Sequence, residues 1–222
     1  MEKYIHVKQV ASFIKDGDCL MVGGFGLVGS PLAIIEELTK SPVKNLTIIS
    51  NNLGEKGKGL GVLVVEKRVK KAIGSYFTSN PDVIRANQAG ELEVLLLPQG
   101  TLSEAIRAGG AGIGGFYIPA GVGTQLEEGR EVKVIQKKTY LFQEALGADV
   151  AIIKAHKADK LGNLVYRKSA RNFNPIMATA AKLVIAEVEE IVEVGELSPE
   201  EIVTPHLFVD YITIGKEHKD EP

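Results

Sequence analysis

A glycine-rich loop between a short apolar run and an amphipathic helix constrains the fold of this chain more than any other feature. Residues 19–22 (CLMV) have the length of a buried strand and lead into residues 23–29 (GGFGLVG). An apolar stripe at helical spacing follows in residues 32–38, and residues 45–50 (NLTIIS) give a second strand. Strand, loop, helix and strand form a βαβ unit, in which the two strands run parallel. We therefore predict an α/β fold: a single-domain, open, mostly parallel sheet flanked by helices.

Local capping signals predict where three helices begin. Ser30 followed by Pro31 supplies an N-cap residue and then a proline at the first helical position. The capping-box spacing, a Ser or Thr three residues before a Glu, occurs at residues 101–104 and again at residues 198–201. We expect a helix to start at each of these points.

The same alternation of short apolar runs and helical stripes continues along the chain. Further strands are predicted at residues 72–76, 90–97, 150–155, 183–188 and 208–214, and helices at residues 61–69 and 81–87. Residues 130–142 alternate as in a hairpin, and the glycine-rich residues 111–124 read as a loop. Because no repeat or linker divides the chain, we predict one domain over residues 1–214 and a polar tail over residues 215–222.

Charge and composition exclude several classes of protein. The 222 residues carry 26 Lys and Arg against 28 Asp and Glu, a net charge of −2, which leaves no basic footprint for nucleic acid. A single cysteine, Cys19, excludes a disulfide framework, and its apolar neighbours favour a small buried side chain over a reactive thiol. The N-terminus lacks a signal-peptide layout, and no apolar run reaches the ~18 residues of a membrane span. We therefore predict a soluble, cytoplasmic protein.

The glycine loop is the first candidate for a binding site. Residues 24–29 (GFGLVG) fit the dinucleotide-binding pattern G-x-G-x-x-G, and backbone amides at the helix start would attract a phosphate. An NAD-binding protein would place an acidic residue at the end of the next strand, where this chain has Ser50, Asn51 and Asn52. The pattern recurs at residues 110–115, so it is not specific by itself. A phosphate or CoA loop is the favoured interpretation, and a tight structural turn is the alternative.

The chain offers no convincing nucleophile or metal site of its own. Its histidines lack metal-ligand spacing and are scattered at His6, His156, His206 and His218. No G-x-S-x-G nucleophile elbow is present. An acidic run near the C-terminus reads as a solvated face and consists of Glu187, Glu189, Glu190 and Glu193. We therefore predict no metal, and a binding loop without a nucleophile beside it.

A series of longer motifs occurs in order along the chain. They are residues 22–31 (VGGFGLVGSP), 90–94 (GELEV), 98–102 (PQGTL), 106–112 (IRAGGAG), 121–124 (GVGT), 158–159 (AD) with 162–163 (GN), 170–175 (ARNFNP) and 187–192 (EVEEIV). From about residue 5 to residue 214, this series resembles the 3-oxoacid CoA-transferase family. It resembles specifically the alpha subunit of those acetate, acetoacetate and succinyl-type members that consist of two kinds of chain. Such a series is far more specific than one glycine pattern.

The resemblance implies an open α/β fold of the kind shared with ribose-5-phosphate isomerase and glucosamine-phosphate deaminases. It implies an enzyme that moves CoA between an acyl-CoA and a short-chain carboxylic or 3-oxo acid, namely acetoacetate, acetate, butyrate, succinate or 3-oxoadipate. The nucleophilic glutamate is expected on the beta subunit, where a glutamyl-CoA thioester forms in a ping-pong reaction. The implied assembly is a heterotetramer of two alpha and two beta chains. Coenzyme A or acyl-CoA is its substrate, and the resemblance implies no permanently bound cofactor.

The resemblance also assigns site residues. Gln99 lies in a Pro-Gln-Gly-Thr motif at the end of a predicted strand, and its amide matches the family's oxyanion stabiliser. The CoA-binding stretch of the family matches Gly23, Gly24, Phe25, Gly26, Leu27, Val28 and Gly29. The polar residues expected to line the same crevice are Asn51, Asn52, Arg171 and Asn172. For the last two, a hydrogen-bonded supporting loop is the alternative.

Two departures from the family pattern bear on the substrate rather than on membership. His206 follows Thr204-Pro205 where glycine is common, and Gln143 stands where glutamate is usual. Two other interpretations stay open. One is a self-sufficient sugar-phosphate isomerase or deaminase, which needs its own acid and base. The other is a nucleotide-binding module without catalysis.

Overall fold

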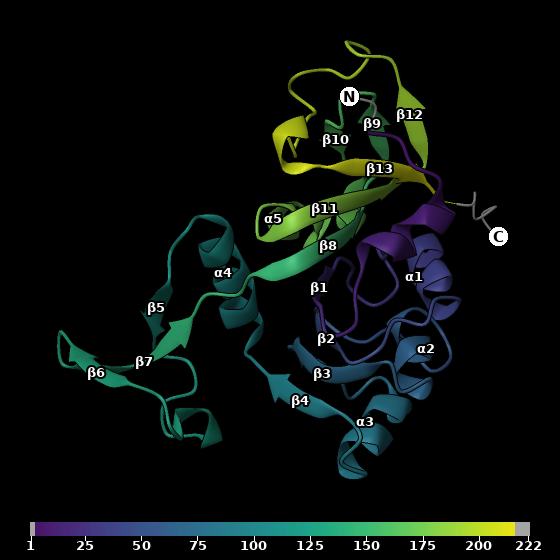
Figure 1. Cartoon of the computed structure of the whole chain (residues 1–222). Helices are drawn as coiled ribbons and strands as arrows, with labels where there is room; N and C mark the ends of the chain where they lie inside the picture. The colour runs from purple at the N-terminus through teal and green to yellow at the C-terminus, as the bar shows by residue number, and fades with distance from the viewer. Residues whose placement is uncertain (1–2, 216–222) are drawn as a thin grey trace.

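The computed structural model describes residues 3–215, and its main body is a seven-stranded sheet with helices on both faces (Figure 1). The strand order is β13-β11-β8-β1-β2-β3-β4, and every pair of neighbours in it is parallel. These strands are β1 (Cys19–Val22), β2 (Leu46–Ile49), β3 (Val69–Gly74), β4 (Glu93–Leu96), β8 (Ala148–Lys154), β11 (Ala181–Val188) and β13 (Tyr211–Ile214). The predicted parallel sheet is confirmed. Except for Gly215, the predicted polar tail lies outside the described residues.

Helices form one layer on each face of this sheet. One layer consists of η1 (Val7–Phe13), α1 (Leu32–Thr39), α2 (Leu60–Val65) and α3 (Pro81–Gln88), and the other of α4 (Gln99–Gly110) and α5 (Asn174–Ala178). Side chains of β1 alternate between the two cores, with Leu20 and Val22 under the first layer and Met21 under the second. Burial on both faces explains why β1 is a continuous apolar run in the sequence.

Two small sheets extend the main body. The antiparallel sheet β5-β7-β6 projects beside α4 in Figure 1 and contains β5 (Gly115–Ile118), β6 (Val132–Ile135) and β7 (Lys138–Glu144). The other sheet, β10-β9-β12, contains β9 (Lys157–Asp159), β10 (Leu164–Val165) and β12 (Glu190–Val192). The remaining short helices are η2 (Gln125–Glu127), η3 (Lys168–Arg171) and η4 (His206–Phe208). The hairpin predicted within residues 130–142 is confirmed. The prediction of a loop over residues 111–124 is wrong at residues 115–118, because β7 pairs with them from a distance along the chain.

The three helix starts predicted from capping signals are wrong. Helix α1 begins at Leu32 with Pro31 in the N-cap position and no side-chain cap. Helix α4 begins at Gln99, directly after the strand-breaking Pro98, so that Thr101 lies inside the helix and is buried. Residues 198–201 form a turn. In α1, hydrogen bonds to a side chain of the distant strand β11 replace the local cap.

A stability prediction follows from two buried threonines. Among the residues that the structure describes, Thr213 Oγ1 is a buried side-chain oxygen without a hydrogen-bond partner, whereas Thr204 Oγ1 lies 2.7 Å from the Tyr166 hydroxyl. Because an unsatisfied buried hydroxyl is destabilising, Thr213→Val is expected to raise the free energy of unfolding by about 1 kcal/mol. The control Thr204→Val breaks a buried hydrogen bond and is expected to lower it by about 1–2 kcal/mol. Chemical unfolding of the purified variants measures both, and a destabilised Thr213→Val protein would show that its hydroxyl has a partner.

Candidate functional site

The glycine loop lies at the point where the order of the sheet reverses. From β1 the chain adds β2, β3 and β4 on one side, and later β8, β11 and β13 on the other. In open α/β sheets, ligands bind in the crevice outside the carboxyl ends of the strands at such a switch point. Residues 23–29 directly follow β1 there, and the loop tip exposes Phe25 and Val28 by 56% and 52%.

The glycines of this loop serve close packing as well as exposure. Phe25 and Val28 pair their backbones, with Phe25 N 3.0 Å from Val28 O, and close a tight turn. A Cβ atom on Gly23 would lie 1.7 Å from Asn174 Oδ1, and one on Gly29 would lie 2.4 Å from the Ala170 carbonyl oxygen. Gly29 also has a φ of +69°. The tight structural turn and the exposed binding tip are therefore two properties of one loop.

Residues 170–174 support the loop from behind. Asn172 accepts a hydrogen bond from Gly24 N (3.1 Å) and donates one to Val28 O (3.0 Å). Asn174 donates to Gly29 O (3.0 Å). The side chain of Asn172 is thus used to hold the loop, which is the alternative that the sequence left open for this residue. Arg171, beside it at the end of η3, is exposed.

The start of α1 is already occupied by a carboxylate of the chain itself. Glu187 Oε2 accepts hydrogen bonds from Ala33 N (2.9 Å) and Ile34 N (3.1 Å), and Glu187 is only 1% exposed. The prediction that Glu187 belongs to a solvated face is therefore wrong, although Glu189, Glu190 and Glu193 are exposed or partly exposed. The prediction that these helix amides attract a phosphate is wrong for the same reason, because a buried anion satisfies them.

The amides that remain for a ligand belong to the loop itself. Within the described part of the chain, the backbone N–H groups of Gly26, Leu27 and Gly29 make no hydrogen bond. Three such donors in one exposed turn can bind a phosphate or carbonyl oxygen of a ligand. The loop therefore stays a candidate binding element, with donors that differ from those of the dinucleotide pattern.

A second group of polar side chains follows β2, β3 and β4 at the same edge of the sheet. Ser75 Oγ lies 3.0 Å from Asn51 Oδ1 and also contacts Gln99 Oε1. Asn51 is 1% exposed, Asn52 is 7% exposed, and Gln99, the first residue of α4, is exposed. With Gln99 Oε1 held by the Ser75 hydroxyl, the Nε2 group is the part of this amide that can donate to a ligand.

Sequence reasoning brought Asn51 and Gln99 to this edge but missed Ser75, which joins them. The missing signal was positional. Ser75 directly follows β3, just as Asn51 follows the end of β2 after one intervening residue, and carboxyl ends of parallel strands meet at one edge.

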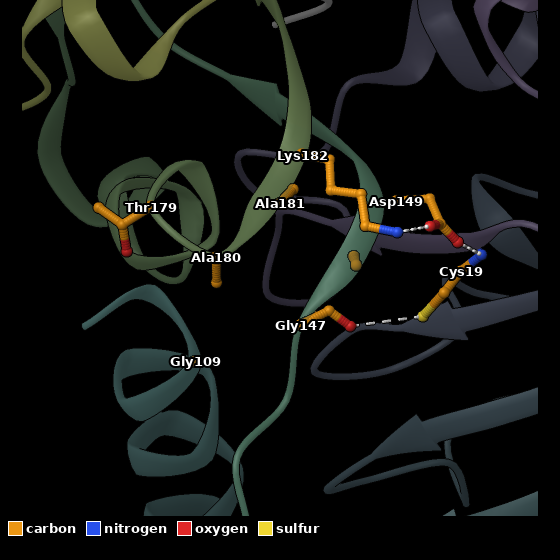
Figure 2. A pocket seen from close by; sticks show the side chains of 9 residues that line it. Cys19, Gly109, Gly147, Asp149, Thr179, Ala180, Ala181 and Lys182 are labelled. Carbon is orange, nitrogen blue, oxygen red and sulfur yellow. Dashed lines mark hydrogen bonds and ion pairs between the residues drawn. The ribbon is translucent and has the colours of Figure 1, made fainter. Parts of the chain in front are cut away.

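The opposite edge of the sheet carries a cavity without catalytic character. A cavity of about 360 Å³ lies at the amino ends of β1, β8 and β11, where Lys182 bonds Asp149 and Cys19 N bonds the same carboxylate (Figure 2). Burial, then the nearby Asp149 and Asp18 carboxylates, raise the pKa of the Cys19 thiol to about 11. The half-buried thiol is therefore protonated at neutral pH and a poor nucleophile.

Other kinds of site are not found in the described residues. No group of three or more His, Cys, Asp or Glu side chains in residues 3–215 is arranged to hold a metal ion. In the same range, no helix is both long and apolar enough to cross a bilayer.

Fold and site together define an open, doubly wound α/β protein that presents amide and hydroxyl donors at the carboxyl edge of its sheet. Residues 4–215 match the family described as Coenzyme A transferase. The chain belongs to this family, and the resemblance seen in the sequence is confirmed.

Relatives of this chain carry related names. It is 52% identical over 208 residues to the A-type chain of a probable succinyl-CoA:3-ketoacid coenzyme A transferase of Bacillus subtilis (strain 168), covering 94% of this chain and 87% of the relative. It is 46% identical to the alpha chain of the acetate CoA-transferase of Escherichia coli (strain K12), covering 98% and 99% of the two chains. These relatives identify the chain as the alpha type of CoA-transferase polypeptide.

A solved structure shares the fold. The acyl-CoA transferase YdiF of E. coli O157:H7, in a thioester complex with CoA, superimposes with a TM-score of 0.85 at 22% sequence identity. The match covers 96% of this chain but 47% of that one, so this chain spans about half the length of YdiF. At this identity the likeness concerns the fold alone.

Proposed function

We propose that this chain is the alpha subunit of an enzyme that moves CoA between an acyl-CoA and a short-chain carboxylic or 3-oxo acid. A separate beta subunit supplies the nucleophilic glutamate, and the enzyme assembles as a heterotetramer of two alpha and two beta chains in the cytoplasm. The observation that carries the proposal is the row Asn51, Ser75 and Gln99, which presents an exposed amide donor at the ligand edge of the sheet.

The chemistry explains what such a donor does. A carboxylate oxygen attacks the thioester carbonyl carbon, and the carbonyl oxygen becomes an oxyanion before the C–S bond breaks and CoA leaves as thiolate. The thiolate then attacks the resulting anhydride at the glutamyl carbonyl, which releases the first acid and leaves a glutamyl-CoA thioester. The acceptor acid reverses these steps. Gln99 Nε2 donates to the oxyanion, and the Ser75 hydroxyl keeps Gln99 Oε1 turned away from it.

The glycine loop has the complementary role of holding CoA. Its free amides at Gly26, Leu27 and Gly29 and its exposed Phe25 face the crevice region of the switch point, where a phosphopantetheine chain can be bound by backbone donors and apolar contact. Asn51 and Asn52 are too buried to meet a ligand broadly, so they support the row behind Gln99.

The test is reconstitution with the partner chain that carries the glutamate. This chain, purified without its partner, is expected to transfer no CoA, and addition of the beta chain is expected to give ping-pong kinetics. A panel of acetoacetate, acetate, butyrate, succinate and 3-oxoadipate then defines the substrate. Robust transfer without the partner, or a covalent CoA adduct on one of this chain's own glutamates, would contradict the proposal. Product formed from ribose 5-phosphate would favour a sugar-phosphate isomerase instead.

Replacement of Ser75 tests how Gln99 is held. In the reconstituted enzyme, Ser75→Ala is expected to lower the turnover number by about tenfold and to leave the KM for acyl-CoA within about threefold, since it loosens a group that acts in the transition state. Steady-state kinetics measure both constants. The exposed Ser12, on η1, provides the control Ser12→Ala, which should behave as wild type. An equal loss in both variants would remove Ser75 from the mechanism.

A further inference from the structure

We infer that Glu187 is a positioning residue for the glycine loop, and that its buried carboxylate sets the affinity for acyl-CoA without touching the ligand. The inference rests on the proposed binding of CoA by residues 23–29. Glu187 lies on β11, two strands away from β1, so neither its place in the sequence nor its strand suggests this role.

One arm of the device runs through α1. Glu187 Oε2 accepts hydrogen bonds from Ala33 N and Ile34 N in the first turn of the helix. Helix α1 begins at Leu32, three residues after Gly29, so an anchored helix start anchors the end of the loop. A carboxylate at this position also interacts favourably with the helix dipole.

The other arm runs through β8 and α5. Glu187 Oε1 lies 3.1 Å from Lys154 Nζ, and the backbone N–H of Lys154 donates to Asn174 Oδ1 (2.9 Å). The Asn174 amide in turn donates to Gly29 O (3.0 Å). Both arms therefore reach the end of the glycine loop, one along the chain and one across the sheet, and they meet at Glu187.

The device needs a carboxylate with both oxygens free to accept. Each oxygen serves one arm, Oε2 the helix amides and Oε1 the lysine. A glutamine has one acceptor oxygen, and its amino group would face either the helix N–H groups or the lysine ammonium. Glu187→Gln therefore releases one arm at almost unchanged side-chain volume.

The enzyme reconstituted with its partner is used for the test. Glu187→Gln and Lys154→Met are each expected to raise the KM for acyl-CoA by about tenfold and to change the turnover number by less than about threefold, because a displaced loop weakens ground-state and transition-state binding alike. Two variants are needed because either one alone could fold poorly. Kinetics are measured well below the unfolding midpoint of each variant.

The same pair of strands supplies a matched control. At their amino ends, Lys182 of β11 pairs with Asp149 of β8 at 2.8 Å, on the edge away from the glycine loop (Figure 2). Lys182→Met removes a cation from this pair as Lys154→Met does from the other, and its KM is expected to equal that of wild type.

Three outcomes separate the inference from the function on which it rests. Folded, active Glu187→Gln and Lys154→Met enzymes with a wild-type KM would overturn the inference. The exposed Phe25 gives an independent probe of the loop: Phe25→Ala should also raise the KM for acyl-CoA. If Phe25→Ala leaves the KM unchanged in an active enzyme, the assignment of CoA to this loop fails. If the wild-type assembly transfers no CoA, the proposed function itself fails.

Discussion

Replacing Gln99 with alanine is expected to lower the turnover number of the reconstituted enzyme by about 10²–10³-fold, as removal of one oxyanion donor does in other acyl-transfer enzymes. The side chain lies at the start of α4, exposed at the ligand edge, with its carbonyl oxygen held by Ser75. Its amino group is therefore presented before the reaction begins, and loss of such a donor is felt in the transition state more than in the bound substrate.

Steady-state kinetics with a saturating acid acceptor measure this effect. Gln99→Glu keeps the size of the side chain but replaces the donor with a carboxylate, so its turnover number should fall at least as far. Gln88, at the exposed end of α3, provides the control Gln88→Ala, which should retain full activity. A turnover number within about threefold of wild type for Gln99→Ala would exclude the side chain as an oxyanion donor.

Replacing Glu187 with alanine is expected to lower the free energy of unfolding by about 3–5 kcal/mol, the usual effect of removing one partner from a buried ion pair. The Glu187 side chain is 1% exposed and Lys154 is 15% exposed. Without the carboxylate, the lysine ammonium and two helix N–H groups lose their shared partner in a buried place.

Chemical unfolding of the purified variants measures this loss. Glu189 provides the matched control, because it lies two residues further along and pairs with His156 at 2.7 Å, but with half of its side chain exposed. Glu189→Ala is expected to change the free energy of unfolding by less than about 1 kcal/mol, as is usual for exposed pairs. Equal losses in the two variants would show that the Glu187 pair is not special.

Local sequence patterns predicted the part of the fold in which neighbours along the chain are neighbours in space. The unit from β1 through the glycine loop and α1 to β2 was predicted, because apolar period and glycines are local signals. Gln99 was placed at a strand end by the same reasoning. The parallel sheet followed from these units, since a crossover helix requires parallel strands.

The sequence could not show contacts that join distant strands. Glu187 caps α1 from more than 150 residues away, so it read as one more member of an acidic face. The expected cap at Ser30 failed because this distant carboxylate satisfies the helix amides instead. Ser75 escaped notice because a lone serine carries no pattern, and only the pairing of β2, β3 and β4 brings it between Asn51 and Gln99.

The tight packing behind the glycine loop changes how evolutionary records of such chains should be used. Gly23 and Gly29 have no room for a methyl group against Asn174 and Ala170, whatever the loop binds. Invariance at these two positions across many genomes would therefore measure a steric demand and not ligand recognition. Variation at the outward-facing Phe25 and Val28, tracked against the acyl group used, is the comparison that carries information about specificity.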